Sequence, residues 1–389
     1  MRSSTNLIAL VVLIAACSTA SAEVIFSIVD LGTLDPVTAG GTYSGAQGIN
    51  DIGQVTGNSA IHAFRTAPNA PIDPATGDVG VAGQLTNAFD INHSGQVAGV
   101  YSGTDSQVTT AFRTAPNQPF NPATDMLGSL GGTYVIPQAI NASAQVVGFS
   151  SVSGGAYGTL HAFRTAPNAA INAATDDLTP DNFIGQTIAH SLNDAGQVVG
   201  TYGNRAFRTA PNAKIRVFED DLGTLGGPYA NALYINASGQ VVGAAMIDNA
   251  HSHAYLTTPN GMILSSSDLG TLGGDSSVAV ALNDLGQVVG RSQFAQGNPS
   301  MMLFLYAGGT MRGLDSLIDP SSGWVLQEVT DINNSGQIVG WGLHDGLQHA
   351  YLMNPIAPLP EPAMIMTVFA ATLGGLRRIR ASVNNPSRS

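Results

Sequence analysis

Three observations predict an all-β fold, a seven-bladed β-propeller of four-stranded antiparallel blades. Only 10% of the 389 residues are charged, while 46 are glycine and 44% are apolar. A typical globular chain carries about a quarter charged residues. One nine-residue phrase, Ile/Leu-Asn-x-x-Gly-Gln-Val-x-Gly, recurs seven times with small departures, and each copy lies among three more strand-like phrases. Four strands in a unit of about 40 to 50 residues are typical of propeller blades.

The asparagine of this phrase recurs every 42 to 52 residues. Within each copy we expect four strands in order: an Asp-Leu-Gly-Thr-Leu strand, an aliphatic strand ending in Ile-Asn, a Gln-Val-Val-Gly strand and a His-Ala-Phe strand. Asn-x-x-Gly predicts a tight turn, because asparagine bonds nearby backbone and glycine accepts a positive φ. The third copy has Ala144 in place of that glycine. There a left-handed conformation costs about 1 kcal/mol, or the turn differs.

The repeat asparagines and the glutamine that follows each turn are predicted to be structural, because a buried amide must find hydrogen-bond partners in every copy. The seven asparagines are Asn50, Asn92, Asn141, Asn193, Asn236, Asn283 and Asn333. The ring closes in one of two ways. Either each blade is contiguous in sequence, or residues 24–34 pair into the sheet that holds residues 349–353.

Loop lengths vary mainly at one end of the predicted propeller. The connection from the last glycine of the phrase to the aromatic residue of His-Ala-Phe runs from 7 to 15 residues, whereas the Asn-x-x-Gly turn keeps its length. In repeat proteins the variable end is often the binding face. We therefore expect a ligand along residues 100–109, 149–160, 244–250, 291–300 and 341–347.

The N-terminus has the organisation of a secretory signal peptide, residues 1–22. Arg2 precedes an apolar run at residues 7–16, and Ala20 and Ala22 form a small-residue cleavage site. The alternative is a lipoprotein signal acylated at Cys17. Cys17 is the single cysteine, so the mature chain is expected to have no disulfide and no thiolate site.

The C-terminal segment, residues 356–389, contains Pro360, Glu361 and Pro362, then an apolar stretch at residues 364–376 and an arginine cluster. One interpretation is a short membrane anchor with a positive cytoplasmic end. The three-part pattern also resembles the PEP-CTERM sorting signal of Gram-negative bacteria. This resemblance implies an exosortase as partner, transient anchoring in the inner membrane and release toward the cell surface. The tail at residues 381–389 is longer than such signals usually have.

Three phrases together, Asp-Leu-Gly-Thr-Leu-Gly-Gly, Ile-Asn-x-x-Gly-Gln-Val-Val-Gly and His-Ala-Phe, resemble the HAF-repeat family of extracellular bacterial proteins. The closest copies combine residues 221–227 with 235–243, and residues 268–274 with 282–290. The resemblance implies secretion and a propeller-like fold. It supplies no catalytic residues, and Met302 departs from the pattern in the sixth copy.

Histidines and acids offer little evidence of an enzyme. His62, His161, His253 and His349 occupy one repeat position, where other copies have Thr110, Arg205 and Met302. A shared metal or catalytic role is therefore not expected, and we predict no metal and no cofactor.

A glycosidase needs two carboxylates at a set separation. Asp125 and similar aspartates could be calcium ligands. We favour the interpretation that they lie in solvated turns, since the regular calcium-binding loop pattern is absent. The acids that do not follow the repeat are Asp105, Glu219, Glu328 and Asp345. Nothing in the sequence brings two of them together.

The sequence thus predicts a non-enzymatic binding or structural module, a propeller over residues 23–355, in the extracellular matrix. Without the two ends, nine basic residues face 25 acidic ones, a net charge of −16, so no nucleic-acid partner is expected. The expected partner is a matrix glycan or a surface protein, and the alternative function is a secreted polysaccharide hydrolase or lyase. Aromatic residues that would stack on sugars, unless they belong to the core, are Trp324, Trp341, Tyr101, Tyr157 and Tyr202.

Overall fold

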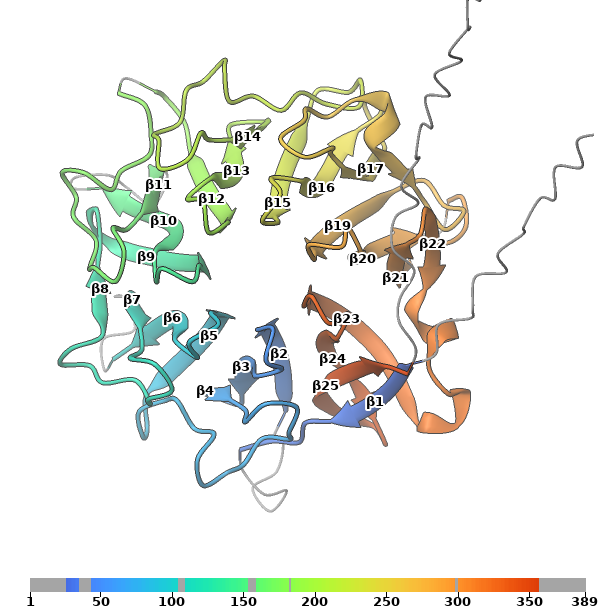
Figure 1. The fold of residues 1–389 in the computed structure, drawn as a ribbon, viewed down its shortest axis with the longest axis horizontal. Coiled ribbons are helices and arrows are strands. Elements are labelled where there is room, and N and C mark those ends of the chain that lie inside the picture. Colours follow the sequence, from blue (N-terminus) through green and yellow to red (C-terminus); the bar gives the residue numbers. More distant parts are fainter. Residues whose placement is uncertain are drawn as a thin grey trace, which may run out of the picture.

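The computed structural model describes residues 26–34, 43–103, 109–152, 159–181, 183–297 and 300–356. Seven small antiparallel sheets stand in a ring around a common axis (Figure 1), so the predicted seven-bladed propeller is confirmed. Four blades have four strands. In the other three, an isolated bridge replaces the fourth strand, and these bridges join Phe64 to Asp78, Phe163 to Asp177 and Phe207 to Asp221. The predicted signal peptide and sorting tail, with Ala20, Ala22, Pro360, Glu361 and Pro362, lie outside the described residues.

We number the blades 1 to 7 by the repeat asparagine that follows the innermost strand. The innermost strands are β2 (Ser44–Ile49), β5 (Leu85–Ile91), β9 (Gly131–Ile140), β12 (Thr187–Leu192), β15 (Ala230–Ile235), β19 (Ser277–Leu282) and β23 (Trp324–Ile332). The second strands are β3 (Val55–Ser59), β6 (Val97–Ser102), β10 (Val146–Val152), β13 (Val198–Tyr202), β16 (Val241–Met246), β20 (Val288–Gln293) and β24 (Ile338–His344).

The third strands carry the His-Ala-Phe position. They are β4 (His62–Arg65), β7 (Thr110–Arg113), β11 (Leu160–Arg164), β14 (Arg205–Arg208), β17 (Ser252–Leu256), β21 (Met301–Ala307) and β25 (Leu347–Pro355). The outermost strands are β8 (Met126–Gly128), β18 (Asp268–Gly270), β22 (Thr310–Gly313) and β1 (Phe26–Asp30). Three short 3₁₀ helices complete the described elements, at Ser265–Ser267, Leu314–Leu317 and Pro320–Ser322.

The blades are offset by one strand from the sequence repeats. The Asp-Leu-Gly segment of one repeat pairs with the His-Ala-Phe strand of the repeat before it, as β18 pairs with β17. The ring therefore closes in the second of the two expected ways. β1 pairs antiparallel with β25, from Phe26 opposite Pro355 to Asp30 opposite Tyr351. Blade 7 thus contains the first and the last strands of the described chain.

The hydrophobic core lies between the blades. Seven clusters of buried apolar residues occur, one at each contact between neighbouring blades. The aromatic residue of each His-Ala-Phe strand is fully buried, which explains why this position is always Phe or Tyr. These residues are Phe64, Phe112, Phe163, Phe207, Tyr255, Phe304 and Tyr351.

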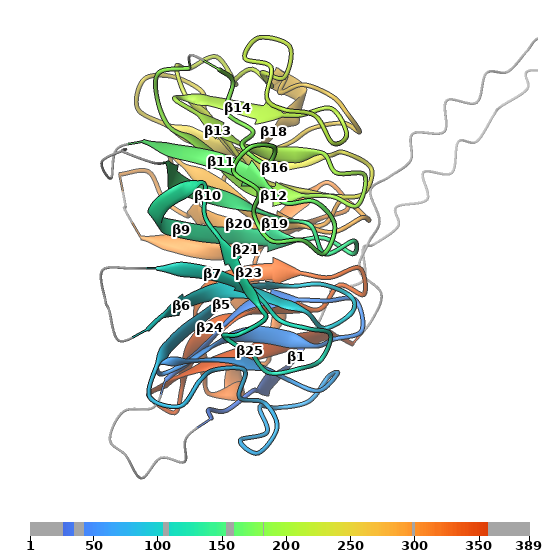
Figure 2. The same cartoon turned by 90° about the vertical axis from the view of Figure 1, so that its left-hand side faces the viewer.

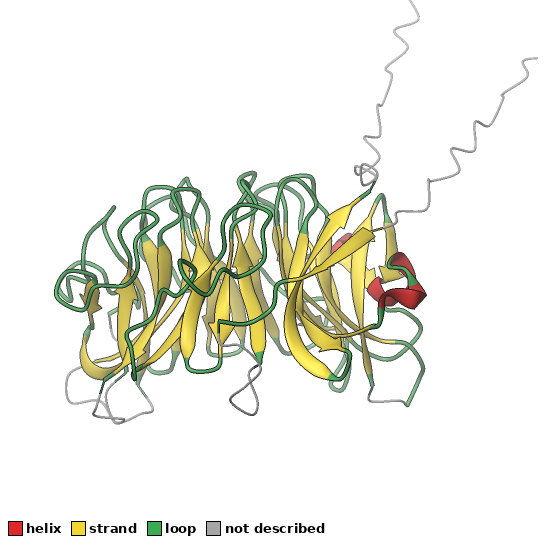
Figure 3. Cartoon of the chain, turned by 90° about the horizontal axis from the view of Figure 1, so that it is seen from below, coloured by secondary structure: helices red, strands yellow, loops and turns green. Residues whose placement is uncertain are grey.

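Alternation of strand direction divides the connections between two faces (Figures 2 and 3). The Asn-x-x-Gly turns share one face with the connections that lead to the outermost strands. The connections of variable length share the opposite face, although residues 104–108, 153–158 and 298–299 are outside the described part. Among the described residues no helix is long and apolar enough to cross a membrane.

Candidate functional site

Each innermost strand carries a β-bulge three residues before its repeat asparagine. In blade 1, Ala46 is opposite Gly57 and Gly48 is opposite Thr56, so Gln47 has no opposite residue on β3. An extra residue bends the strand and re-aims its side chain. The seven bulged residues are Gln47, Phe89, Gln138, His190, Leu233, Val280 and Thr330.

The bulge also explains the glycine that ends the repeated phrase. This glycine lies opposite the residue that precedes the bulge, where the backbone of the innermost strand comes very close. A Cβ atom on Gly57 would lie 2.1 Å from the backbone oxygen of Gly45, and one on Gly340 would lie 2.0 Å from that of Glu328. No side chain fits at that distance, so bulge and glycine recur together.

Six bulged residues line a cavity of about 460 Å³ inside the ring. The side chains that complete it come from blades 6 and 7. Arg291 on β20 and Trp341 on β24 are the first residues of two of the ranges that were expected to bind a ligand. The lining consists of Gln47, Gln138, His190, Leu233, Val280, Thr330, Arg291, Glu328, Val329 and Trp341. No two neighbouring blades contribute the same type of bulged residue. The repeat therefore does not fix which side chains line this cavity.

One side of the cavity carries an ion pair next to an aromatic ring. Arg291 Nη1 lies 3.0 Å from Glu328 Oε2, and Glu328 is opposite Trp341 in the pairing of β23 with β24. Burial raises the pKa of Glu328, although Arg291 acts in the other direction. The Nε atom of Arg291 is buried and has no hydrogen-bond partner among the described residues. The pair therefore has hydrogen-bonding capacity left for a ligand.

His190 extends the polar part of this cavity without adding charge. Burial lowers the pKa of His190 to about 4, so its imidazole is neutral at neutral pH. A neutral imidazole offers one donor and one acceptor, and the amides of Gln47 and Gln138 offer both as well. The cavity therefore presents mixed donors and acceptors around one tryptophan.

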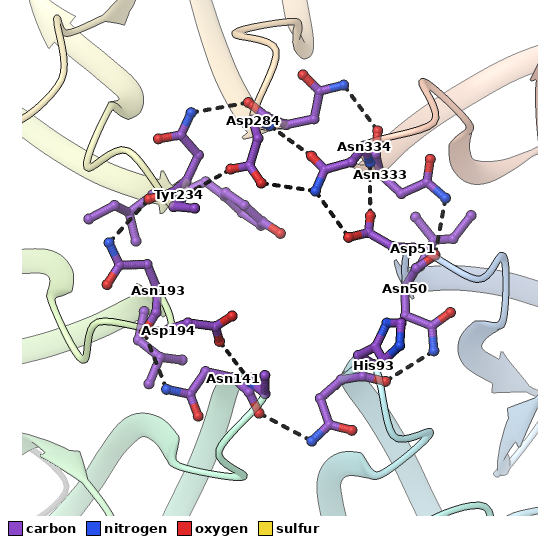
Figure 4. Close-up of a pocket in the computed structure, with 18 of the residues that line it drawn as sticks. Asn50, Asp51, His93, Asn141, Asn193, Asp194, Tyr234, Asp284, Asn333 and Asn334 are labelled. Carbon is purple, nitrogen blue, oxygen red and sulfur yellow. Dashed lines mark hydrogen bonds between the residues drawn. The ribbon is translucent and has the colours of Figure 1, made fainter.

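The repeat asparagines form a closed ring of hydrogen bonds at the face of the short turns (Figure 4). The Nδ2 atom of each asparagine donates to the backbone oxygen of the asparagine in the next blade, over 3.0 to 3.2 Å, and Asn333 returns to Asn50. The same Nδ2 atom also donates to the glutamine four residues later, as Asn50 does to Gln54 at 3.0 Å. The backbone N–H of that glutamine donates back to the asparagine Oδ1. The asparagine and glutamine side chains of the phrase thus stabilise their own turn, and the asparagine also links neighbouring blades.

A second cavity of about 210 Å³ lies inside this asparagine ring. Its side chains are mostly bonded to one another: Asn334 Nδ2 donates to Asp51 at 3.0 Å and to Asp284 at 2.9 Å. Tyr234 points toward the middle of the ring (Figure 4). Because these polar groups are already paired, this cavity is less suited to a ligand than the one lined by the bulged residues.

The acids expected from the sequence do not converge. Glu328 lines the larger cavity, whereas Glu219 lies in an exposed loop and Asp345 in an exposed turn. Asp125 accepts the backbone N–H of Asn121 at 2.9 Å and so caps its own turn. Asp105 lies outside the described residues. The described part of the chain therefore places a single carboxylate in this cavity.

The aromatic candidates also separate. Trp341 is the one that lines the larger cavity. Trp324 stacks on His344, Tyr101 packs against Phe120, and the hydroxyl of Tyr202 donates to the Val217 backbone. Tyr157 lies outside the described residues.

His190 and the two glutamines of the cavity were not predicted from the sequence. Their signal was present, since the residue three positions before the repeat asparagine changes almost every time, while the residue before it is alanine in five of the seven copies. Without the bulge, however, alternation along a strand does not show that this residue faces the axis.

Comparison with known proteins does not identify a family. No protein-family model matches the chain, and no curated protein matches it. One similar solved structure is the extracellular domain of a proposed one-component system from B. thetaiotaomicron, with 12% identity and a TM-score of 0.41. The match covers 84% of this chain and 39% of that one, so this chain spans about two fifths of its length.

Proposed function

We propose that the protein is a non-enzymatic binding module that holds a matrix glycan in the cavity of bulged residues. The observation that carries this proposal is the cavity of about 460 Å³ whose lining is not dictated by the repeat. Ligand sites are concave and combine apolar or aromatic surface with a few placed polar groups. This cavity has that composition.

The chemistry of the lining favours a hydroxyl-rich ligand over an ionic one. Gln47, Gln138 and neutral His190 supply uncharged donors and acceptors, and the Arg291–Glu328 pair adds charge-assisted ones without a large net charge. Trp341 supplies the apolar ring face on which a sugar ring packs. The described lining contains one carboxylate, whereas a glycosidase uses two, so binding is favoured over the alternative of a polysaccharide hydrolase or lyase.

Export to the cell surface is part of the same proposal. It is supported by the signal-peptide pattern and by Pro360, Glu361 and Pro362 before an apolar stretch and an arginine cluster. A tail of this kind is proposed to be cut by an exosortase after transient anchoring in the inner membrane. The proposed setting of the glycan is therefore the matrix outside the cell.

Glycan arrays probed with the full chain test the binding proposal. We expect binding to a defined set of neutral polysaccharides. Trp341→Ala is expected to weaken this binding roughly tenfold or more, since tryptophan is among the residues that contribute most to binding energy. Glu328→Gln is expected to weaken it as well. Glu219→Gln is the matched control, because Glu219 is exposed and far from the lining in sequence, and it should leave affinity unchanged.

Two results would count against the proposal. An array without any binding by the native chain would remove the glycan as ligand. Turnover of a polysaccharide that is lost in Glu328→Gln would show an enzyme instead of a binding module.

A further inference from the structure

A pair of histidine and aspartate side chains recurs at the outer edge of the blades. Histidine Nδ1 lies 2.8 to 2.9 Å from an aspartate oxygen in His62–Asp78, His161–Asp177 and His253–Asp268. The aspartate also accepts the backbone N–H two residues later, as Asp78 does from Gly80. This pair joins the third strand to the outer segment of the same blade. One histidine in each blade is enough to make this link between strand and outer segment.

Blade 7 has the same pair and a second histidine. His349 on β25 pairs with Asp30 on β1 over 2.8 Å, and His344 on β24 approaches the same oxygen of Asp30 over 2.9 Å. The ligand atoms of the three residues all lie within 4.8 Å of one another. No other group of three or more His, Cys, Asp or Glu residues with this spacing occurs in the described part of the chain.

A tight hairpin positions the extra histidine. Asp345 and Gly346 form the turn between β24 and β25 with φ of +50° and +82°, as expected for a two-residue hairpin turn. His344 is opposite Leu347, and His349 is opposite Gly342. The two histidines are therefore diagonal neighbours on one face of the hairpin. The ring of Trp324 stacks on His344 with a centroid distance of 4.8 Å and an angle of 7°, which fixes the imidazole.

Two imidazoles and a carboxylate are ligands that suit a divalent transition-metal ion. Zinc–ligand bonds of about 2.0–2.2 Å place tetrahedral ligands about 3.3 Å apart, so the two histidine–aspartate distances of 2.8 and 2.9 Å need to open by only roughly half an ångström. The three side chains are 14 to 29% exposed. An ion can therefore enter from solvent and keep water as a further ligand.

We propose that Asp30, His344 and His349 bind a divalent transition-metal ion, and that this ion fastens the closure of the ring. The three ligands come from β1, β24 and β25, which are the first and the last two strands of the described chain. A bound ion adds a link between the two ends at the blade where the ring is joined by hydrogen bonds to a strand of five residues. This inference does not depend on the proposed glycan site.

Calorimetric titration of the full chain with Zn²⁺ after treatment with a chelator tests the proposal, together with the melting temperature. The native protein is expected to bind one equivalent through this site and to melt at a higher temperature with Zn²⁺, because a ligand that binds only the folded state stabilises it. His344→Ala removes one ligand and leaves the His349–Asp30 pair. It is expected to lower affinity roughly tenfold or more and to abolish the rise in melting temperature.

His253→Ala is the matched control, since it removes a histidine–aspartate pair that has no second histidine. It should keep both the bound equivalent and the zinc-dependent stabilisation. Melting in chelator shows whether each variant is folded, and His349→Gln replaces His344→Ala if the latter does not fold. The proposal is overturned if the native chain binds no Zn²⁺, or if His344→Ala and His349→Gln bind and are stabilised as the native chain is.

Discussion

The asparagine ring and the layer of bulged residues are three positions apart in the sequence of every blade, yet they differ in how much their residues vary. The ring has asparagine in all seven blades, and each side chain makes bonds within its own turn and to the next blade. The bulged layer has six residue types in seven blades. The residue type is constant where a side chain must join two blades. It varies in the bulged layer, where side chains face a cavity.

Substitution of one residue from each layer of blade 1 tests this difference directly. Asn50→Ala removes a donor to Asn92 and leaves the Gln54 N–H without its acceptor, so we expect a loss of about 3 kcal/mol of stability from the unpaired buried groups. Gln47→Ala shortens a side chain that lines the cavity, and we expect a change within about 0.5 kcal/mol. Chemical denaturation followed by circular dichroism measures both.

Equal losses in the two variants would mean that the asparagines are constant for a reason other than the ring. A large loss in Gln47→Ala alone would place the structural role in the bulged layer. The comparison is matched, because both residues belong to the same strand and its turn and both are truncated to alanine.

The repeat made most of the fold predictable. Spacing and phrase order predicted seven blades, four strands per unit and the Asn-x-x-Gly turns. The offset of one strand was not predictable, because Asp-Leu-Gly can pair equally well with the strand before or after it along the chain; the pairing of Asp30 with Tyr351 settles it. Among the acid candidates in the described part of the chain only Glu328 lines the cavity, because Glu219 lies in an exposed loop and Asp345 in an exposed turn. The bulge decides which residues of the innermost strands face the axis, and the sequence pattern alone does not show a bulge.

Two aspartates between the layers provide a test by pH. Asp331 lies two residues before Asn333 and accepts the backbone N–H groups of Ile49 and Ile332. Burial raises its pKa from 3.8 to about 8, with a further contribution from Asp90. Burial likewise raises the pKa of Asp90 to about 7. Both carboxyls are therefore held mainly in the neutral form by the fold at mildly acidic pH.

A raised pKa in the folded state stabilises the protein fully below the unfolded pKa, and this contribution is lost as pH rises through the folded value. We therefore expect the melting temperature to fall between about pH 4 and pH 8, the window between the ordinary pKa of 3.8 and the raised value of about 8. Asp331→Asn keeps an acceptor without a charge, so it should flatten this slope and raise the melting temperature at pH 8 by about 2–4 °C. A slope that is unchanged in Asp331→Asn would assign the pH dependence to other groups.

The smallest expected effect concerns the one turn in the ring that lacks its glycine. Ala144 has φ of +58°, and its backbone N–H still donates to Asn141 at 2.9 Å. The turn is therefore kept, and of the two expectations for this copy the left-handed alanine is the one observed. This conformation costs a residue with a Cβ atom about 1 kcal/mol or more. A glycine avoids that cost, but it also increases the conformational entropy of the unfolded chain, which offsets part of the stabilisation. Ala144→Gly should thus raise stability by somewhat less than about 1 kcal/mol in a denaturation experiment.

Gly196→Ala is the reverse change in the next blade, at φ of +76°. It should lower stability, and it carries the added cost that its Cβ would lie 2.3 Å from Asn212 Oδ1. If both changes left stability the same, the ring would tolerate either residue and the glycine of the phrase would need another explanation.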